Sequence, residues 1–222
     1  MRLLPSGSAA LLVELDGLDD VLALYAALAA APPDGVLDVV PAARTVLLVT
    51  DPARTTLAAV ADAVRRTTPV PGAQQGGDTV ELPVRYDGAD LTEAAALLSL
   101  SPDELVARHT GSEWTVAFCG FSPGFGYLTQ RGAEWDVPRR STPRTKVPPG
   151  SVALAGEFSG VYPRESPGGW QLIGRTDVAD GTPGGSTLVD NTAVSTYVDV
   201  MASPTDVTTA AAADDPDTGL RA

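Results

Sequence analysis

The chain of 222 residues is poor in the residues that build metal sites and disulfides. It has one cysteine, Cys119, and one histidine, His109. A single cysteine cannot form a disulfide within the chain, and zinc sites rich in cysteine or built on paired histidines cannot form either. The sequence therefore offers no set of metal ligands that we can identify.

Positive charge and long apolar runs are also scarce. Lysine and arginine total 15 against 28 aspartates and glutamates, a net charge of −13, and Lys146 is the only lysine. This balance argues against a surface for nucleic acid or anionic membranes. No uninterrupted apolar run is long enough to span a bilayer, and the N-terminus lacks the apolar segment of a signal peptide. We therefore expect a soluble, cytoplasmic protein.

Two familiar catalytic motifs are missing. No Gly-rich loop ends in Gly-Lys-Ser/Thr, because Lys146 follows Thr145, so a Walker-type nucleotide site is excluded. Residues 120–124 (GFSPG) match the nucleophile elbow of serine hydrolases, but that elbow needs the backbone N–H after the serine, and Pro123 has none. We interpret this segment as a rigid loop that holds Phe121, Phe125 and Tyr127.

Residues 1–78 have the pattern of a small α/β domain. Apolar and β-branched runs predict strands at 10–15, 36–40 and 45–50. Helical spacing begins at Leu18, and Asp51-Pro52 predicts the start of a second helix. The expected order is β-α-β-β-α. Residues 69–78, rich in proline and glycine, are expected to be a linker.

Residues 79–202 have a different texture. A strand at 81–86 and two short helices are expected first, with capping boxes formed by Asp90 and Glu93 and by Ser101 and Glu104. Short β-like runs separated by long loops then predict an all-β barrel or sandwich. The runs are 115–119, 151–155, 170–173 and 194–200. The tail, 203–222, is expected to be disordered.

Aromatic and basic residues gather in one part of the chain. Nine of the twelve aromatic residues lie between Trp114 and Trp170, and 131–175 holds seven basic and four acidic residues. Arginine binds carboxylate or phosphate at two points, so this region could form a pocket for an anionic substrate. The alternative is a loop whose arginines pair with acidic residues elsewhere. The arginines concerned are Arg139, Arg140, Arg144, Arg164 and Arg175.

His109 and Cys119 each allow two interpretations. His109 ends a predicted helix just before Gly111, which suits either a residue favoured by the helix dipole or a general acid/base. Cys119 lies in an apolar run beside Phe118, which favours a core residue over a reactive thiol.

Four blocks in order resemble the allophanate hydrolase subunit 1 family, which includes the B subunit of 5-oxoprolinase and the kinase inhibitor KipI. They are 120–128 (GFSPGFGYL), 138–152 (PRRSTPRTKVPPGSV), 161–163 (VYP) and 166–176 (SPGGWQLIGRT). The resemblance implies an α+β protein, with the small N-terminal domain followed by a cyclophilin-like β-barrel of the carboxyltransferase type.

The resemblance also implies a function in a complex. The family works with a homologous second subunit, and the 5-oxoprolinase version adds a third, its A subunit. That assembly opens 5-oxoproline to glutamate with ATP hydrolysis, and its substrate is a small anion. Such a role would make His109 the candidate acid/base, with Arg139 and Arg144 on the substrate carboxylate or a phosphorylated intermediate. The expected substrate-binding residues are Phe121, Gly124, Phe125, Tyr127, Arg139, Arg144, Ser151, Tyr162, Gly168, Gly169, Trp170 and Arg175.

Two other functions share this scaffold. One is a regulatory inhibitor of a histidine kinase, similar to KipI. The other is a subunit of the allophanate hydrolase or carboxyltransferase type that acts on a urea-derived substrate. None of the four blocks distinguishes these functions from a role in a 5-oxoprolinase.

Overall fold

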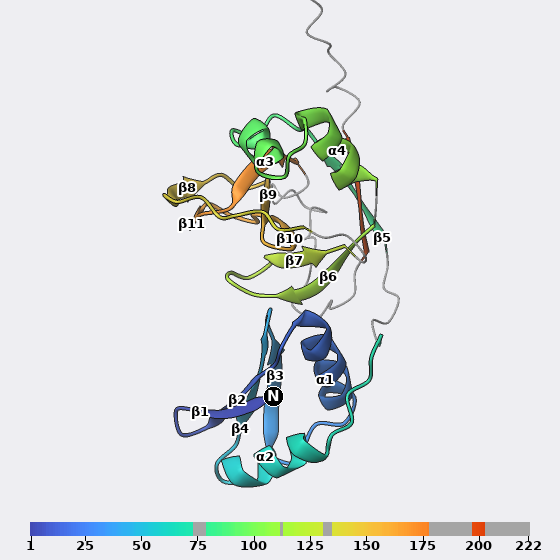
Figure 1. The fold of residues 1–222 in the computed structure, drawn as a ribbon. Helices are drawn as coiled ribbons and strands as arrows, with labels where there is room; N and C mark the ends of the chain where they lie inside the picture. The colour runs from blue at the N-terminus through green and yellow to red at the C-terminus, as the bar shows by residue number, and fades with distance from the viewer. Residues whose placement is uncertain (73–78, 112, 131–134, 178–196, 203–222) are drawn as a thin grey trace, which may run out of the picture.

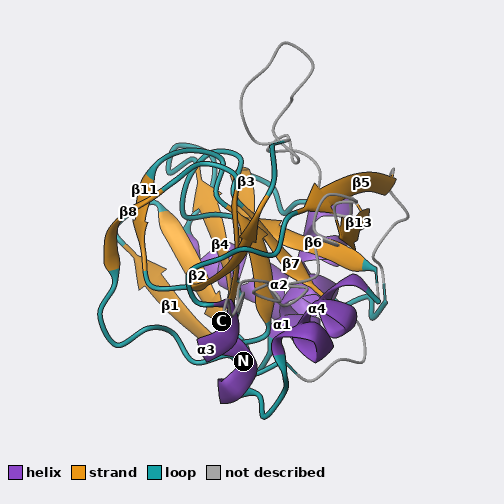
Figure 2. Ribbon diagram, turned by 90° about the horizontal axis from the view of Figure 1, so that it is seen from above, coloured by secondary structure: helices purple, strands orange, loops and turns teal. Residues whose placement is uncertain are grey.

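A computed structural model describes residues 1–72, 79–111, 113–130, 135–177 and 197–202. In Figure 1 the first sheet and its two helices lie below strands β6 (Trp114–Cys119) and β7 (Gly126–Thr129) of the second sheet. Figure 2 places β8 (Arg144–Val147) and β11 (Ser166–Gly168) at one side of the molecule. It places β5 (Thr79–Val84) and β13 (Tyr197–Ala202) at the opposite side. The expected tail, 203–222, and most of the expected linker lie outside the described residues.

The first half is a four-stranded antiparallel sheet with two helices. The strand order is β1 (Arg2–Ser6), β2 (Ala10–Glu14), β4 (Thr45–Thr50) and β3 (Val36–Pro41). Helix α1 (Leu18–Ala30) buries Val21, Leu24 and Leu28 against this sheet. The predicted order β-α-β-β-α corresponds to β2, α1, β3, β4 and α2 (Leu57–Arg66), and the additional strand β1 precedes these elements. The exposed, proline-containing β1 carries no strand pattern of its own and is held by its pairing with β2.

The second helix starts later than predicted. Asp51 accepts a hydrogen bond from the N–H of Ala53, which makes a local turn rather than a helix start. The true N-cap of α2 (Leu57–Arg66) is Thr56, whose side chain accepts from the N–H of Ala59. The helix start at Asp51-Pro52 is therefore wrong by about one turn and a half.

The second half is built on a seven-stranded sheet and a two-stranded one. The strand order of the large sheet is β12-β9-β10-β7-β6-β13-β5, and β8 pairs with β11. The strands are β5 (Thr79–Val84), β6 (Trp114–Cys119), β7 (Gly126–Thr129), β8 (Arg144–Val147), β9 (Ser151–Ala155), β10 (Phe158–Val161), β11 (Ser166–Gly168), β12 (Gln171–Arg175) and β13 (Tyr197–Ala202). Helices α3 (Leu91–Leu97) and α4 (Pro102–Thr110) follow β5.

Segment 85–90 brings the two edges of the large sheet together. Arg85 follows β5 and exchanges two backbone hydrogen bonds of 2.8 Å with Arg175 of β12. The N–H groups of Gly88 and Asp90 then donate to the carbonyls of Ile173 and Leu172. The described residues thus form a mixed α/β fold with several antiparallel sheets and few helices. They join the sheet edges through this one segment, and do not show a barrel closed along whole strands.

The two halves share one apolar cluster. Leu18, the first residue of α1, packs in the core of the second half with Phe118 and Phe125, whereas Val21 and Leu24 of the same helix belong to the first core. Leu22 and Ala42 are partly buried against the same cluster. This packing positions the loop after β6 beside the first sheet.

Candidate functional site

Five of the predicted substrate-binding residues meet in one aromatic cluster. Phe125 is its centre, with ring centroids 5.2 Å from Tyr162, 5.4 Å from Trp170 and 5.5 Å from Phe121. Tyr127 lies 5.6 Å from Trp170. Nearly all these rings meet edge to face, the arrangement that the quadrupole of aromatic rings favours. The cluster defines one face of the candidate site.

The loop that carries Phe121 is fixed by its own backbone. The N–H of Ser122 donates to the carbonyl of Gly120 at 2.6 Å, and the N–H of Phe125 donates to the carbonyl of Ser122 at 3.0 Å. Gly124 has a φ of +82°, which suits glycine. Phe121 has a φ of +62°, an uncommon value for a residue with a side chain. The loop therefore presents the Phe121 ring in a set position.

Most of the predicted arginines pair with carboxylates. Arg144 donates to both oxygens of Asp90, at 2.8 and 2.7 Å, and Arg140 donates to Asp90 Oδ1 at 2.6 Å. Arg175 pairs with Asp87, and Lys146 with Glu165. For these residues the structure favours the alternative in which basic groups pair with acidic residues.

Asp90 is the anchor that sequence reasoning missed. It is predicted as the cap of α3, but its side chain makes no capping hydrogen bond. Its carboxylate instead accepts from two arginines and from the N–H of Leu172 at 2.8 Å. Burial alone would raise the pKa of Asp90, but the hydrogen bonds and charges of these partners lower it overall. The second predicted capping box, Ser101 with Glu104, is confirmed.

Arg139 is the arginine that remains beside the aromatic cluster. Its guanidinium lies 5.7 Å from the centre of the Trp170 ring, and it forms no ion pair among the described residues. The backbone on either side is fixed. The carbonyl of Pro138 accepts from Gln171 Nε2 at 3.2 Å, and the N–H of Arg140 donates to the carbonyl of Gly169 at 2.8 Å. This exposed cation is therefore held over the cluster and available to an anion.

Two tyrosine hydroxyls belong to the same face. Burial raises the pKa of Tyr127 and of Tyr162, and the nearby positive charge of Arg139 opposes part of each shift. Both phenols are therefore neutral near pH 7, and Tyr127, which is partly exposed, can donate a hydrogen bond to a ligand.

The predicted glycines and serine position other residues. A Cβ on Gly168 would lie 2.2 Å from the Tyr162 hydroxyl, so only glycine allows that tyrosine its place. The carbonyl of Ser151 accepts from the N–H of Tyr162 at 2.9 Å, and the carbonyl of Gly169 holds Arg140. Arg164 is exposed.

The structure does not bring His109 to the cluster. Its ring is fully buried, with Nδ1 2.7 Å from the Tyr86 hydroxyl and Nε2 2.9 Å from Ser159 Oγ. Burial lowers its pKa to about 3, so the imidazole is neutral. Neither the acid/base role nor a charged residue at the helix end finds support in this geometry. His109 instead links α4 to β10 through the core.

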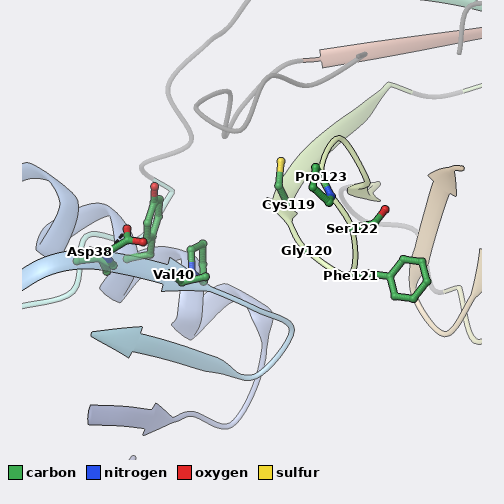
Figure 3. A pocket seen from close by; sticks show the side chains of 10 residues that line it. Asp38, Val40, Cys119, Gly120, Phe121, Ser122 and Pro123 are labelled. Atoms are coloured by element: carbon green, nitrogen blue, oxygen red, sulfur yellow. Dashed lines mark hydrogen bonds between the residues drawn. The ribbon is translucent and has the colours of Figure 1, made fainter. Parts of the chain in front are cut away.

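A separate cleft of about 470 Å³ lies between the two halves. Tyr25, Asp38 and Val40 line one side, and Cys119 and Pro123 line the other. Phe121 and Ser122 line the cleft as well, and Figure 3 shows their side chains extending away from Asp38 and Val40. Cys119 is half-buried at this cleft. No sequence motif marks Tyr25 or Asp38, because the cleft forms only when the halves pack together.

Neither a metal cluster nor a membrane-spanning helix occurs in the described part of the chain. Among the described residues, no group of three or more His, Cys, Asp or Glu side chains is placed to hold a metal ion. In that same part of the chain, no helix combines the length and the apolar character that crossing a membrane requires.

Comparison with known sequences identifies close relatives of one segment. The chain is 48% identical over 103 residues to the 5-oxoprolinase B subunit of Bacillus subtilis (strain 168), which covers 45% of this chain and 43% of that protein. It is 47% identical over 103 residues to the 5-oxoprolinase B subunit of Escherichia coli O157:H7, covering 45% and 47%. The matched segment thus spans less than half of each of these relatives.

Comparison with solved structures extends over most of the chain. The protein TTHA0988 is 34% identical with a TM-score of 0.67, over 87% of this chain and 40% of that one. A conserved uncharacterized protein of Pyrococcus horikoshii, PH0987, is 30% identical with a TM-score of 0.51, over 92% and 99%. The urea amidolyase of K. lactis shares the fold alone, at 15% identity and a TM-score of 0.68, over 91% and 15%.

The family match agrees with these comparisons. The family described as carboxyltransferase domain, subdomain C and D, matches residues 1–197, which is most of the chain. The resemblance that the four sequence blocks indicate is therefore confirmed, and this chain belongs to the family of carboxyltransferase domains, subdomain C and D.

Proposed function

We propose that this chain is a subunit of a 5-oxoprolinase complex, which opens the lactam ring of 5-oxoproline to give glutamate with hydrolysis of ATP. The observation that carries the proposal is the 48% identity, over 103 residues, to a protein named as the B subunit of 5-oxoprolinase. The chain would act with a homologous second subunit and with the A subunit of 5-oxoprolinase. Its second half would be the cyclophilin-like domain of that assembly.

The geometry supports a site for a small carboxylate. Arg139 is fixed over Trp170 without a carboxylate partner among the described residues, and it would bind the carboxylate of 5-oxoproline. The neutral hydroxyl of Tyr127, which is partly exposed, lies near the same guanidinium. It would donate to the lactam oxygen, where negative charge develops when water adds to the carbonyl carbon.

The reaction consumes two molecules of water. One adds to the lactam carbonyl carbon as the C–N bond breaks, and the ring nitrogen takes up a proton to become the amino group of glutamate. The other is consumed as the phosphoanhydride of ATP is cleaved, and the free energy of that cleavage reaches the ring opening through a shared phosphorylated intermediate. The described residues fit a nucleotide poorly. Arg140, Arg144 and Arg175 are paired with carboxylates, and among the described residues Arg139 is the arginine recorded against the aromatic cluster without such a pair. We therefore assign ATP to another subunit.

The test is reconstitution. The chain is produced together with the A subunit and the homologous second subunit of the same organism, and the purified assembly is incubated with 5-oxoproline and ATP. We expect equal amounts of glutamate and ADP, and neither product when this chain is left out. An assembly that contains all three subunits and releases no glutamate would contradict the proposal.

A further inference from the structure

We infer that Phe121 determines the specificity of this site, because its ring covers the flat face of a small planar lactam whose carboxylate is held by Arg139. The inference rests on the proposed function and adds the recognition of the ring to it. Three observations on Phe121 carry it, namely its backbone conformation, its exposure and its neighbours.

The backbone of Phe121 is strained. Its φ of +62° lies in the left-handed region, where the Cβ of an L-residue crowds the backbone. The loop already contains Gly120 and Gly124, so glycine is accepted at two nearby positions. A bulky aromatic residue in this conformation persists only when the surroundings fix it, and such strain concentrates at functional sites.

The Phe121 ring buries little apolar surface, so burial does not offset the backbone strain. The residue is 58% exposed, whereas Phe125 in the same loop is almost fully buried. Folding alone would favour glycine here, since glycine removes the strain and an exposed apolar ring adds little stability. Strain and exposure at one residue therefore point to a contact that is absent from the isolated chain.

The ring faces the candidate site. Figure 3 shows it extending away from Asp38 and Val40, and therefore away from the first sheet. On that side its edge-to-face neighbours are Phe125 at 5.5 Å and Tyr162 at 6.4 Å, and the charge of Arg139 acts on Tyr162. Phe125 lies 5.4 Å from Trp170, and the Arg139 guanidinium lies 5.7 Å from the centre of the Trp170 ring, so Phe121 and Arg139 belong to the same cluster.

This arrangement favours one class of ligand. An exposed aromatic ring and a held guanidinium on one aromatic cluster suit a small planar ring that carries a carboxylate, because the ring can stack while the carboxylate pairs. The amide of 5-oxoproline keeps its five-membered ring nearly flat. An open-chain amide such as N-acetylalanine has the same carboxylate and amide without the ring, and it would lose the stacking contact.

The experiment compares four variants in the reconstituted complex. Phe121→Ala removes the ring and keeps the strained backbone, Phe121→Gly removes both, and Phe121→Tyr keeps a ring. Leu97→Ala is the control, because Leu97 is an exposed apolar residue on α3. The measurements are KM and kcat for 5-oxoproline, inhibition by N-acetylalanine, and the melting temperature of each variant as a single chain.

We expect Phe121→Ala and Phe121→Gly to raise KM roughly tenfold with similar kcat, and Phe121→Tyr and Leu97→Ala to change it less than about twofold. Both ring deletions should leave inhibition by N-acetylalanine unchanged, which a general loss of structure would not. Phe121→Gly should melt higher than Phe121→Ala because it relieves the strain.

The outcomes separate the two proposals. A wild-type KM in Phe121→Ala, or equal weakening of 5-oxoproline and N-acetylalanine, would overturn the role of Phe121 and leave the proposed function in place. A complete wild-type assembly that makes no glutamate would overturn the proposed function, and this inference with it.

Discussion

Arg144 donates two hydrogen bonds to the carboxylate of Asp90, from Nη1 to Oδ2 at 2.8 Å and from Nη2 to Oδ1 at 2.7 Å. The Asp90 side chain is only 3% exposed. The pair links β8 to the segment that joins the edges of the large sheet. It also explains why Arg144 is unavailable to a ligand although the sequence places it in an arginine-rich region. The ion pair thus stabilises the fold and leaves Arg139 as the cation of the site.

We expect Asp90→Asn to lower the free energy of unfolding by about 3 kcal/mol or more, because it removes the carboxylate that two partly buried guanidinium groups share. The matched control is Asp87→Asn. Asp87 pairs with Arg175 at the surface, so its loss should change stability by about 1 kcal/mol or less. Urea denaturation measures both. An equal loss in the free energy of unfolding for the two variants would show that the Asp90 ion pairs stabilise the fold no more than a surface pair does.

We expect Arg139→Ala to raise KM for 5-oxoproline by roughly 10- to 100-fold, because a charge-assisted contact with the carboxylate is lost. Arg164→Ala is the control, since Arg164 is a similarly exposed arginine in the same half. Steady-state kinetics of the complex and melting of the single chain provide the test. Unchanged kinetics in Arg139→Ala would remove Arg139 from the site.

Acid should destabilise the protein through His109. Its pKa is about 3 when folded and ordinary, near 6.5, when unfolded, so the unfolded chain binds an additional proton between these values. The His109 contribution is therefore complete above pH 6.5 and is lost as the pH falls toward 3. The change should reach roughly 1.4 kcal/mol per pH unit inside this window.

Urea unfolding from about pH 7 to about pH 4 measures this dependence, in a range where Asp90, with its lowered pKa, contributes little. The comparison is His109→Gln, which keeps a polar side chain that does not titrate. This variant should be less stable at pH 7 but should show a much flatter pH dependence. The same slope in both proteins would assign the effect to other groups.

Gly88→Ala should disrupt the joining of the sheet edges. A Cβ on Gly88 would lie 2.3 Å from the backbone of Ile173 and Leu172, which cannot move without breaking β12. We expect a loss of about 2 kcal/mol or more in the free energy of unfolding. Gly169→Ala is the control, because its nearest new contact would be an ordinary 3.7 Å. A melting temperature for Gly88→Ala equal to that of Gly169→Ala would contradict this account.

Local signals in the sequence predicted much of the fold. Runs of β-branched residues located β3 and β4, and the Ser101 capping box located α4, because each signal depends on neighbours in the chain. The short strands β7, β8, β10 and β11 were not predicted. They are three or four residues long, contain glycine or proline or carry charge, and are held in place by pairing with other strands. Such pairing leaves no local period to detect.

The sequence indicated the region of the site better than the role of each residue. Motif 120–128 and the arginine-rich block contain Phe121, Phe125, Tyr127 and Arg139, which the fold brings together. No property of the sequence separates Arg139 from Arg140 and Arg144, since the difference depends on Asp90, about fifty residues earlier. Likewise, only the packing around His109 shows that the single histidine is enclosed.

Helix α1 contributes Leu18 to one core and Val21 and Leu24 to the other, so neither core is complete without it. Cleavage of the chain near residue 78 would separate Leu18 from Phe118 and Phe125. Each fragment would then expose apolar surface and tend to aggregate. Calorimetry of the intact protein should then record a single melting event for both halves. Production of the second half alone would require a redesign of the surface that this helix covers.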